Sequence, residues 1–123
     1  MSFEPVLRRM IDGVPGALGI ALMGSDGIPI AECHATDTGA ADGGEVGAAG
    51  VEFGRILDEI RKASDAIGGG RLDEAVVGLG RLWLLFRVLD EELFVVAALE
   101  PRGNLGKARF LMRRHLLDLQ RAL

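Results

Sequence analysis

The residue pair with the clearest potential for chemistry is Cys33 next to His34, because a thiolate beside an imidazole is the basis of one kind of nucleophilic catalysis. The two residues are neighbours in a segment that we predict to be a strand, and adjacent side chains of a strand point to opposite faces. A nucleophile and its base would then lie out of hydrogen-bond reach. We therefore expect a buried thiol and a solvated imidazole instead of a catalytic pair.

Metal binding has no recognisable ligand set in this sequence. Cys33 is the only cysteine, and the second histidine, His115, lies far along the chain among Arg113, Arg114 and Asp118. Structural zinc sites take four Cys or His ligands at characteristic spacing. The other carboxylates fall on predicted helix faces and turns, where solvation is the default. We therefore expect no catalytic residues, no cofactor, no metal and no enzymatic activity.

Two glycine runs suggest nucleotide binding at first sight. The phosphate-binding loop needs four residues between its glycines and a Ser or Thr after its lysine. The run Gly103–Lys107 has two residues between its glycines, and an alanine follows its lysine. The triple glycine at 68–70 follows a predicted helix, so it presents no helix N-terminus to a phosphate. We interpret both runs as structural turns.

Composition limits the class of protein. The chain has 123 residues, of which 49% are hydrophobic and 26% charged, which fits a single globular domain over 1–123. A net charge of −4 argues against a nucleic-acid partner, since binding to phosphates needs a basic face. The first residues contain no apolar signal-peptide core, and no apolar run reaches the about 18 residues of a membrane span. We expect a cytoplasmic protein with no membrane partner.

Hydrophobic periodicity predicts three helices. The first follows Pro5 and ends before Gly13, where a glycine can adopt the left-handed conformation of a helix end. The second has an apolar stripe over Phe53–Ile67, with charged residues on the opposite side. The third begins after Asn104, whose side-chain oxygen can accept from the unpaired N–H groups of the first turn.

Alternation and short apolar runs predict five strands. The first two form a hairpin around the turn Ser25–Gly27, and the last three cover Leu72–Leu79, Leu82–Leu89 and Leu93–Leu99. Their short links join only antiparallel neighbours. The small polar residues at about 35–45 predict a flexible loop. The predicted fold class is α/β of the α+β type, in the order α-β-β-α-β-β-β-α, with helices on both faces of a five-stranded antiparallel sheet.

Three glycines, Gly47, Gly50 and Gly54, lie on one flank of the second helix beside Asp58 and Arg61. Each costs about 1 kcal/mol relative to alanine in a helix interior. Two explanations remain open. Either the first turns are frayed or part of the loop, or a second helix approaches closely along this flank.

The stretch Val14–Gly16 before a strand, and above all the run Asn104–Arg109 after a buried strand, resemble the roadblock/LC7 family in its bacterial MglB/MglC-like branch. The resemblance covers nearly the whole chain. It implies a homodimer, or a pairing with a related chain, in which the central helices lie side by side and the third strands join into one sheet. The predicted dimer interface comprises Gly47, Gly50, Val51, Gly54, Asp58, Arg61, Ala75, Val76 and Val77.

The resemblance also implies partners and a function. We expect a non-catalytic regulator or adaptor of a Ras-like small GTPase in bacterial polarity or gliding motility. The alternative is a structural adaptor that binds another roadblock dimer, which the short segment after the third helix favours, and a ligand-binding sensory domain is a third hypothesis. Geometry alone suggests a partner-binding surface on the solvent side of the second helix, made of Glu52, Arg55, Glu59 and Lys62.

Overall fold

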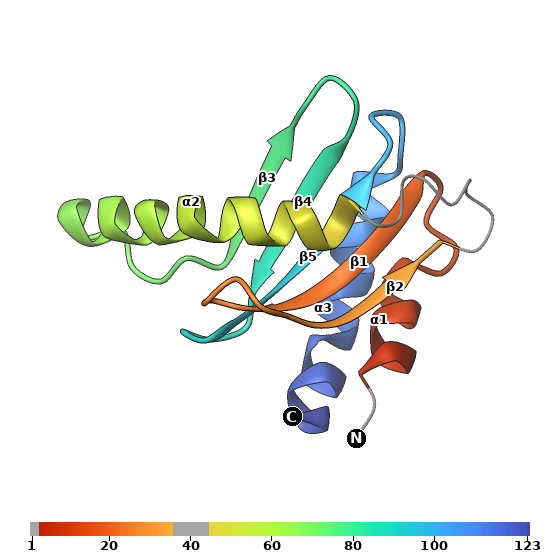
Figure 1. Ribbon diagram of the computed structural model, residues 1–123, viewed down its shortest axis with the longest axis horizontal. Coiled ribbons are helices and arrows are strands. Elements are labelled where there is room, and N and C mark those ends of the chain that lie inside the picture. The colour runs from red at the N-terminus through yellow and green to blue at the C-terminus, as the bar shows by residue number, and fades with distance from the viewer. Residues whose placement is uncertain (1–2, 36–44) are drawn as a thin grey trace.

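The computed structural model describes residues 3–35 and 45–123, and it confirms the predicted fold class and element order (Figure 1). Within these two ranges the sheet has five antiparallel strands and is accompanied by three helices. In chain order the elements are α1 (Glu4–Ile11), β1 (Ala17–Gly24), β2 (Pro29–His34), α2 (Glu45–Ile67), β3 (Glu74–Gly78), β4 (Trp83–Val88), β5 (Leu93–Leu99) and α3 (Leu105–Ala122).

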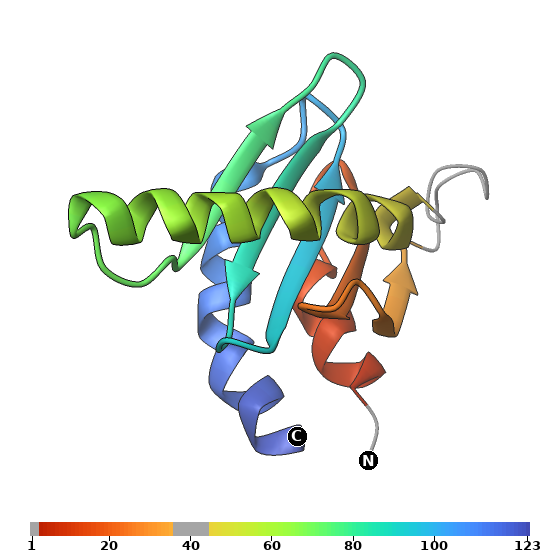
Figure 2. The ribbon, with the colours of Figure 1, turned by 60° about the vertical axis from the view of Figure 1, so that its left-hand side comes forward.

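The strand order is β2-β1-β5-β4-β3, so the last strand of the sequence lies in the middle of the sheet. α1 and α3 cover one face of the sheet, and α2 crosses the other face (Figures 1 and 2). β1 and β5 are buried on both faces, which explains their nearly continuous apolar sequence. The two strands with a free edge are therefore β2 and β3.

The hydrophobic core forms two layers, one on each face of the sheet. Side chains of β1, β4 and β5 alternate between a layer under α1 and α3 and a layer under α2. In the α2 layer the rings of Phe53 and Phe94 both pack against Phe86, with centroid distances of 5.7 and 6.1 Å. These rings hold the N-terminal half of α2 on the sheet.

Two predicted turns have the expected local chemistry. In the β1–β2 hairpin, the side chain of Asp26 accepts a hydrogen bond from the N–H of Ile28 at 3.1 Å, and Gly27 has a φ of +88°. At the start of α3, the N–H of Lys107 donates to Asn104 Oδ1 at 2.9 Å, which confirms the predicted N-cap. Side-chain hydrogen bonds to the backbone thus stabilise both turns.

Some boundaries differ from the prediction. β3 begins at Glu74 and ends at Gly78, so it is shorter than the predicted strand Leu72–Leu79. The predicted flexible loop at about 35–45 falls almost entirely on residues 36–44, outside the described part of the chain. No helix among the described residues has the length and apolar character needed to cross a membrane.

Candidate dimer and partner surfaces

Cys33 and His34 lie on opposite faces of β2, as the alternation of a strand requires. The Cys33 thiol is buried and donates to the carbonyl oxygen of Glu4 at 3.4 Å, and this burial raises the pKa of the thiol. The expected solvated imidazole is wrong: His34 is half-buried, and its Nδ1 is buried without a hydrogen-bond partner in the described structure. The ring fits there because Gly19 on the neighbouring strand carries no side chain.

His115 and Arg109 on α3 each contact a carboxylate. His115 Nδ1 lies 3.1 Å from Asp118 Oδ2, one turn further along α3. Arg109 donates two hydrogen bonds to the Glu74 carboxylate, at 2.9 and 2.7 Å, and these bonds raise the pKa of the guanidinium. This fork ties α3 to β3. Within the described ranges, no three His, Cys, Asp or Glu side chains come together as metal ligands.

The most unusual feature of the fold is the length of α2. Its 23 residues span about 34 Å, whereas five strands span only about 19 Å from one edge of the sheet to the other. Its C-terminal half therefore projects beyond β3 (Figures 1 and 2). The last α2 residue in the core layer is Leu57. We call the segment from Glu59 to Ile67 the overhang.

The overhang and the turn before it expose a row of isoleucines. Ile56, Ile60 and Ile67 lie on one side of α2 at helical spacing and are 47%, 37% and 82% exposed. The sequence predicted them in the stripe that faces the core, and the structure corrects this, because the sheet ends before they reach it. Isolated exposed apolar residues are ordinary, but a row on a projecting helix indicates a contact surface.

The three glycines of α2 face the chain's own sheet. The helix begins at Glu45, so the frayed-turn explanation is wrong. A Cβ on Gly50 would lie 2.7 Å from Met23 Sδ, one on Gly54 would lie 3.7 Å from the Phe94 ring, and one on Gly47 would collide with the Glu32 carboxylate. Close approach of a second helix therefore does not explain these three glycines either. The glycines allow α2 to approach β1, β2 and β5.

This placement predicts opposite effects for two matched substitutions. Gly54→Ala is expected to raise the free energy of unfolding by about 1 kcal/mol, because alanine favours the helix and its Cβ would make ordinary contact with Phe94. Gly50→Ala is expected to lower it by about 1 kcal/mol, because the Cβ collides with the fully buried Met23 and overpacking exceeds the helical gain. Urea unfolding followed by circular dichroism measures both. Equal changes in the free energy of unfolding, or loss of self-association in Gly54→Ala, would contradict the placement of these glycines against the chain's own sheet.

The predicted pair Asp58 and Arg61 forms within one chain. Arg61 Nη1 donates to Asp58 Oδ1 at 2.7 Å, while Arg61 Nη2 is buried without a partner among the described residues. The expected reciprocal pairing of these two residues across a two-fold axis stays a prediction. Val51 is 43% exposed and lies on the same flank of α2 as Asp58, away from the isoleucine row.

One backbone edge of β3 pairs with no other strand in the described part of the chain. The carbonyl of Asp73 accepts from Val88 N at 2.9 Å, and Leu79 N donates to the Leu82 carbonyl at 3.0 Å. Because residues of a strand alternate in hydrogen-bond direction, odd-numbered residues of β3 bond to β4. The N–H and C=O of Val76, which is opposite Leu85, therefore point to the free edge. Ala75 and Val77, also in the predicted interface, have side chains against the core under α2.

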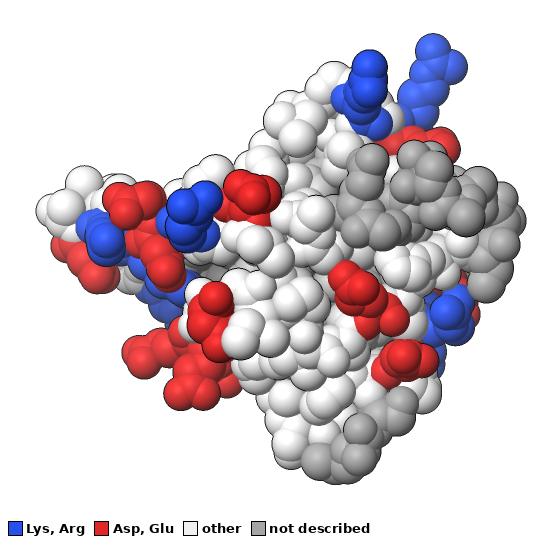
Figure 3. Space-filling model, viewed as in Figure 1, with Lys and Arg blue, Asp and Glu red and all other residues white. Residues whose placement is uncertain are grey.

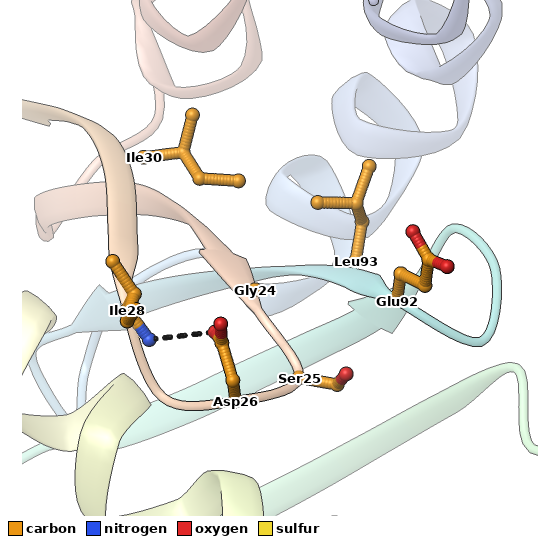
Figure 4. A pocket seen from close by; sticks show the side chains of 7 residues that line it. All are labelled: Gly24, Ser25, Asp26, Ile28, Ile30, Glu92 and Leu93. Atoms are coloured by element: carbon orange, nitrogen blue, oxygen red, sulfur yellow. Dashed lines mark hydrogen bonds between the residues drawn. The ribbon is translucent and has the colours of Figure 1, made fainter.

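A hollow lies between the β1–β2 turn and the β4–β5 turn, beside the other edge of the sheet (Figure 4). Ile30 and Leu93 face each other across it, while Ile28, 60% exposed, lies at its border. The two turns are joined by a hydrogen bond from Ser25 N to the Glu92 carbonyl at 2.7 Å. The predicted hairpin around Ser25–Gly27 gave no indication of this hollow. The lining residues are Gly24, Ser25, Asp26, Ile28, Ile30, Glu92 and Leu93.

Comparison with known proteins assigns the fold. No protein-family model and no curated protein matches the chain. Among solved structures, MglC from Myxococcus xanthus is 28% identical, with 100% of each chain covered and a TM-score of 0.71. The chain has the roadblock/LC7 fold and is similar to the MglB/MglC-like branch of that family. A roadblock/LC7 domain from Streptomyces avermitilis is 13% identical, covering 95% of this chain and 93% of that one, with a TM-score of 0.79.

A third similar structure, the gliding protein MglB from Thermus thermophilus, is 18% identical. The match covers 97% of this chain and 86% of that one, with a TM-score of 0.82. At this identity the likeness concerns the fold. The fold is therefore shared with the MglC structure over the whole chain and with the MglB structure over 97% of it.

The predicted partner-binding residues of this roadblock chain lie on the solvent side of α2. Glu52 and Arg55 form an exposed ion pair at 3.6 Å, and Glu59 and Lys62 form another at 3.2 Å. Figure 3 shows side chains of both charges along the projecting half of the helix. Exposed pairs of this kind contribute about 0–1 kcal/mol each to stability. They are therefore free to exchange partners with little loss of folding stability.

Proposed function

We propose that this chain is a non-catalytic regulator or adaptor of a Ras-like small GTPase, acting as a homodimer in the cytoplasm in bacterial polarity or gliding motility. The observation that carries the proposal is the overhang of α2, with its isoleucine row, next to the unpaired edge of β3. An exposed edge strand and an exposed apolar row are both hazards in a monomer. A second copy of the chain covers both at once.

The geometry of such a dimer follows from the sheet. Antiparallel pairing of β3 with its symmetry mate places the two-fold axis perpendicular to the sheet, so both α2 helices lie on the same face. The sheet continues into the second copy, and the overhang of each chain then lies over this continued sheet. Ile60 and Ile67 become buried, and the N–H and C=O of Val76 gain ladder partners.

In this dimer the solvent sides of both α2 helices form a common outer surface. Glu52, Arg55, Glu59 and Lys62 lie on it and carry both signs of charge, which suits recognition of a polar protein surface. We assign the GTPase contact to these residues. The likeness to the gliding protein MglB supports the motility context.

Two measurements test the proposal. Light scattering at micromolar concentration is expected to give the mass of a dimer, and a monomer would contradict it. The cognate small GTPase, loaded with GDP or with GTP, is then captured on the immobilised dimer, and single-turnover GTP hydrolysis is followed. Binding that prefers one nucleotide state supports regulation. Absence of binding to both states, with the dimer intact, would exclude direct action on the GTPase.

The second candidate function is an adaptor that binds another roadblock dimer. Two observations favour it: the identity to MglC is 28% over the whole of both chains, whereas that to the MglB structure is 18%, and the hollow beside β2 offers apolar side chains on the edge opposite the proposed dimer contact. In this reading the paralogue occupies the hollow. The α2 surface of this chain then takes no part in the contact.

The hollow gives this candidate a direct test. Ile28→Asp places a charge at the border of the hollow on a residue that is 60% exposed, so the fold is expected to persist while the affinity for a roadblock paralogue falls about tenfold or more. Leu79→Asp is the matched control, because Leu79 is 42% exposed and directly follows β3, at the edge of the sheet opposite β2. Calorimetric titration with the paralogue measures both. Equal losses of affinity in the two variants would show that the hollow is not part of the interface.

A further inference from the structure

The outward face of α3 carries an apolar ridge. Phe110 and Leu117 are seven residues apart, which is two helical turns, and they are 59% and 54% exposed. The opposite side of the helix supplies Ala108, Met112 and Leu119 to the core. Phe110 and Leu117 therefore point directly away from the protein, and nothing in the fold of the monomer explains an aromatic and a leucine side chain there.

Basic side chains flank this ridge on both sides. Arg113 lies on one side of it, and Lys107, Arg114 and Arg121 lie on the other, and all four are exposed. Arg109, the fifth basic residue of the helix, is engaged by Glu74 instead. We call Lys107, Phe110, Arg113, Arg114, Leu117 and Arg121 the basic ridge.

The charge of the basic ridge is opposite to that of the whole chain. The protein has a net charge of −4, whereas α3 contains five Lys and Arg residues and a single carboxylate, Asp118. That carboxylate lies 3.1 Å from His115. Within the described ranges, none of the four basic side chains of the ridge forms an ion pair, so their charges face solvent unneutralised. A concentrated positive surface on an acidic protein indicates an anionic partner.

We infer that the basic ridge binds the surface of an anionic lipid bilayer, with α3 lying in the interfacial plane. Phe110 and Leu117 enter the headgroup region, and the four basic side chains contact lipid phosphates. This is the composition of interfacial helices, in which aromatic and leucine residues are accompanied by Lys and Arg. The ridge is convex and about 21 Å long from Lys107 to Arg121, so a flat bilayer can contact all of it at once.

The position of α3 makes this contact compatible with the proposed dimer. α3 lies on the face of the sheet opposite α2 (Figures 1 and 2). A two-fold axis perpendicular to the sheet places both copies of α3 on that same face, so a dimer offers two basic ridges to one membrane while its α2 surface remains free. The sequence-based expectation of no membrane partner rested on the absence of a spanning segment, which does not bear on surface binding.

Vesicle co-sedimentation tests the inference. The wild-type protein is expected to pellet with vesicles of phosphatidylcholine mixed with phosphatidylglycerol and to remain in the supernatant with phosphatidylcholine alone, and raising the salt concentration is expected to release it. Arg114→Ser combined with Arg121→Ser is expected to lower the partition coefficient by about 30-fold for each ridge that contacts the membrane, since each basic residue contributes about 1 kcal/mol and about 1.4 kcal/mol corresponds to tenfold. Phe110→Ser and Leu117→Ser are expected to weaken binding with the charge unchanged.

The matched control is Arg55→Ser combined with Lys62→Ser, which removes the same charge from exposed positions on α2. It is expected to leave vesicle binding at the wild-type level. Equal loss in control and ridge variants, or no binding to phosphatidylglycerol vesicles, would overturn the inference. Capture by polyglutamate with no vesicle binding would assign the ridge to an acidic protein instead. Light scattering distinguishes a loss of vesicle binding from a loss of the dimer. The ridge variants are expected to keep the wild-type mass.

Discussion

Replacement of both Ile60 and Ile67 by aspartate is expected to convert the protein into a folded monomer at micromolar concentration. Both side chains are exposed in the single chain, at 37% and 82%, so the substitutions remove no core contact. In the proposed dimer each would be buried, and burial of one isoleucine contributes about 1.5–3 kcal/mol. Four such side chains are lost per dimer, and unpaired charges take their places. The dissociation constant is expected to rise about a thousandfold or more.

Light scattering across a concentration series measures this change. The matched control is Ala66→Asp, which places the same charge on the solvent side of the overhang and is expected to leave the dimer intact. Circular dichroism and urea unfolding of the double variant establish that the fold is retained. A double variant that keeps the dimer mass would show that the isoleucine row is not the contact surface.

Val76→Pro is expected to weaken the dimer by removing a backbone hydrogen-bond donor from the free edge of β3. Proline has no N–H, and the N–H of Val76 points to the free edge of β3, so the bonds between β3 and β4 are kept. Across the proposed junction, two symmetry-related donors are lost, at about 1–3 kcal/mol each when the partner carbonyl is left unpaired. The dissociation constant is expected to rise about 30-fold or more.

Two comparison variants make this result specific. Val76→Thr keeps the backbone donor and is expected to keep the dimer. Val77→Pro removes a donor that faces β4, because Val77 is opposite Leu84 in the bonded register, and it is expected to destabilise the monomer by about 3 kcal/mol. Sedimentation velocity and urea unfolding distinguish the two behaviours. A dimer that tolerates Val76→Pro would mean that β3 does not form the junction.

Much of the fold was predictable because its signals are local. Helical and strand periodicities give the element types, and turn residues such as Gly27 and the cap Asn104 give their ends. The order of strands in the sheet was not predictable in this way. Placement of β5 between β1 and β4 depends on long-range pairing, and that placement makes β2 and β3 the edges. The surfaces that we propose as functional lie at or beside these edges.

The glycines of α2 illustrate what a helical wheel leaves open. The sequence correctly grouped Gly47, Gly50 and Gly54 on one flank, because their spacing is a property of the helix itself. It did not specify what packs against that flank, and the structure places Met23 and Phe94 there. Close approach is the correct physical explanation of the small residues, and the neighbour is the chain's own sheet.

The amphipathic character of α2, the burial of β5 and the capped start of α3 could all be predicted, because these properties depend on residues close in the chain. Which apolar residues are left uncovered depends on the packing of the elements in three dimensions. The isoleucine row is exposed because the sheet is narrower than α2 is long. Phe110 and Leu117 are exposed because α3 uses its other side to cover the sheet. Exposure depends on where neighbouring elements end, and no local pattern contains that information.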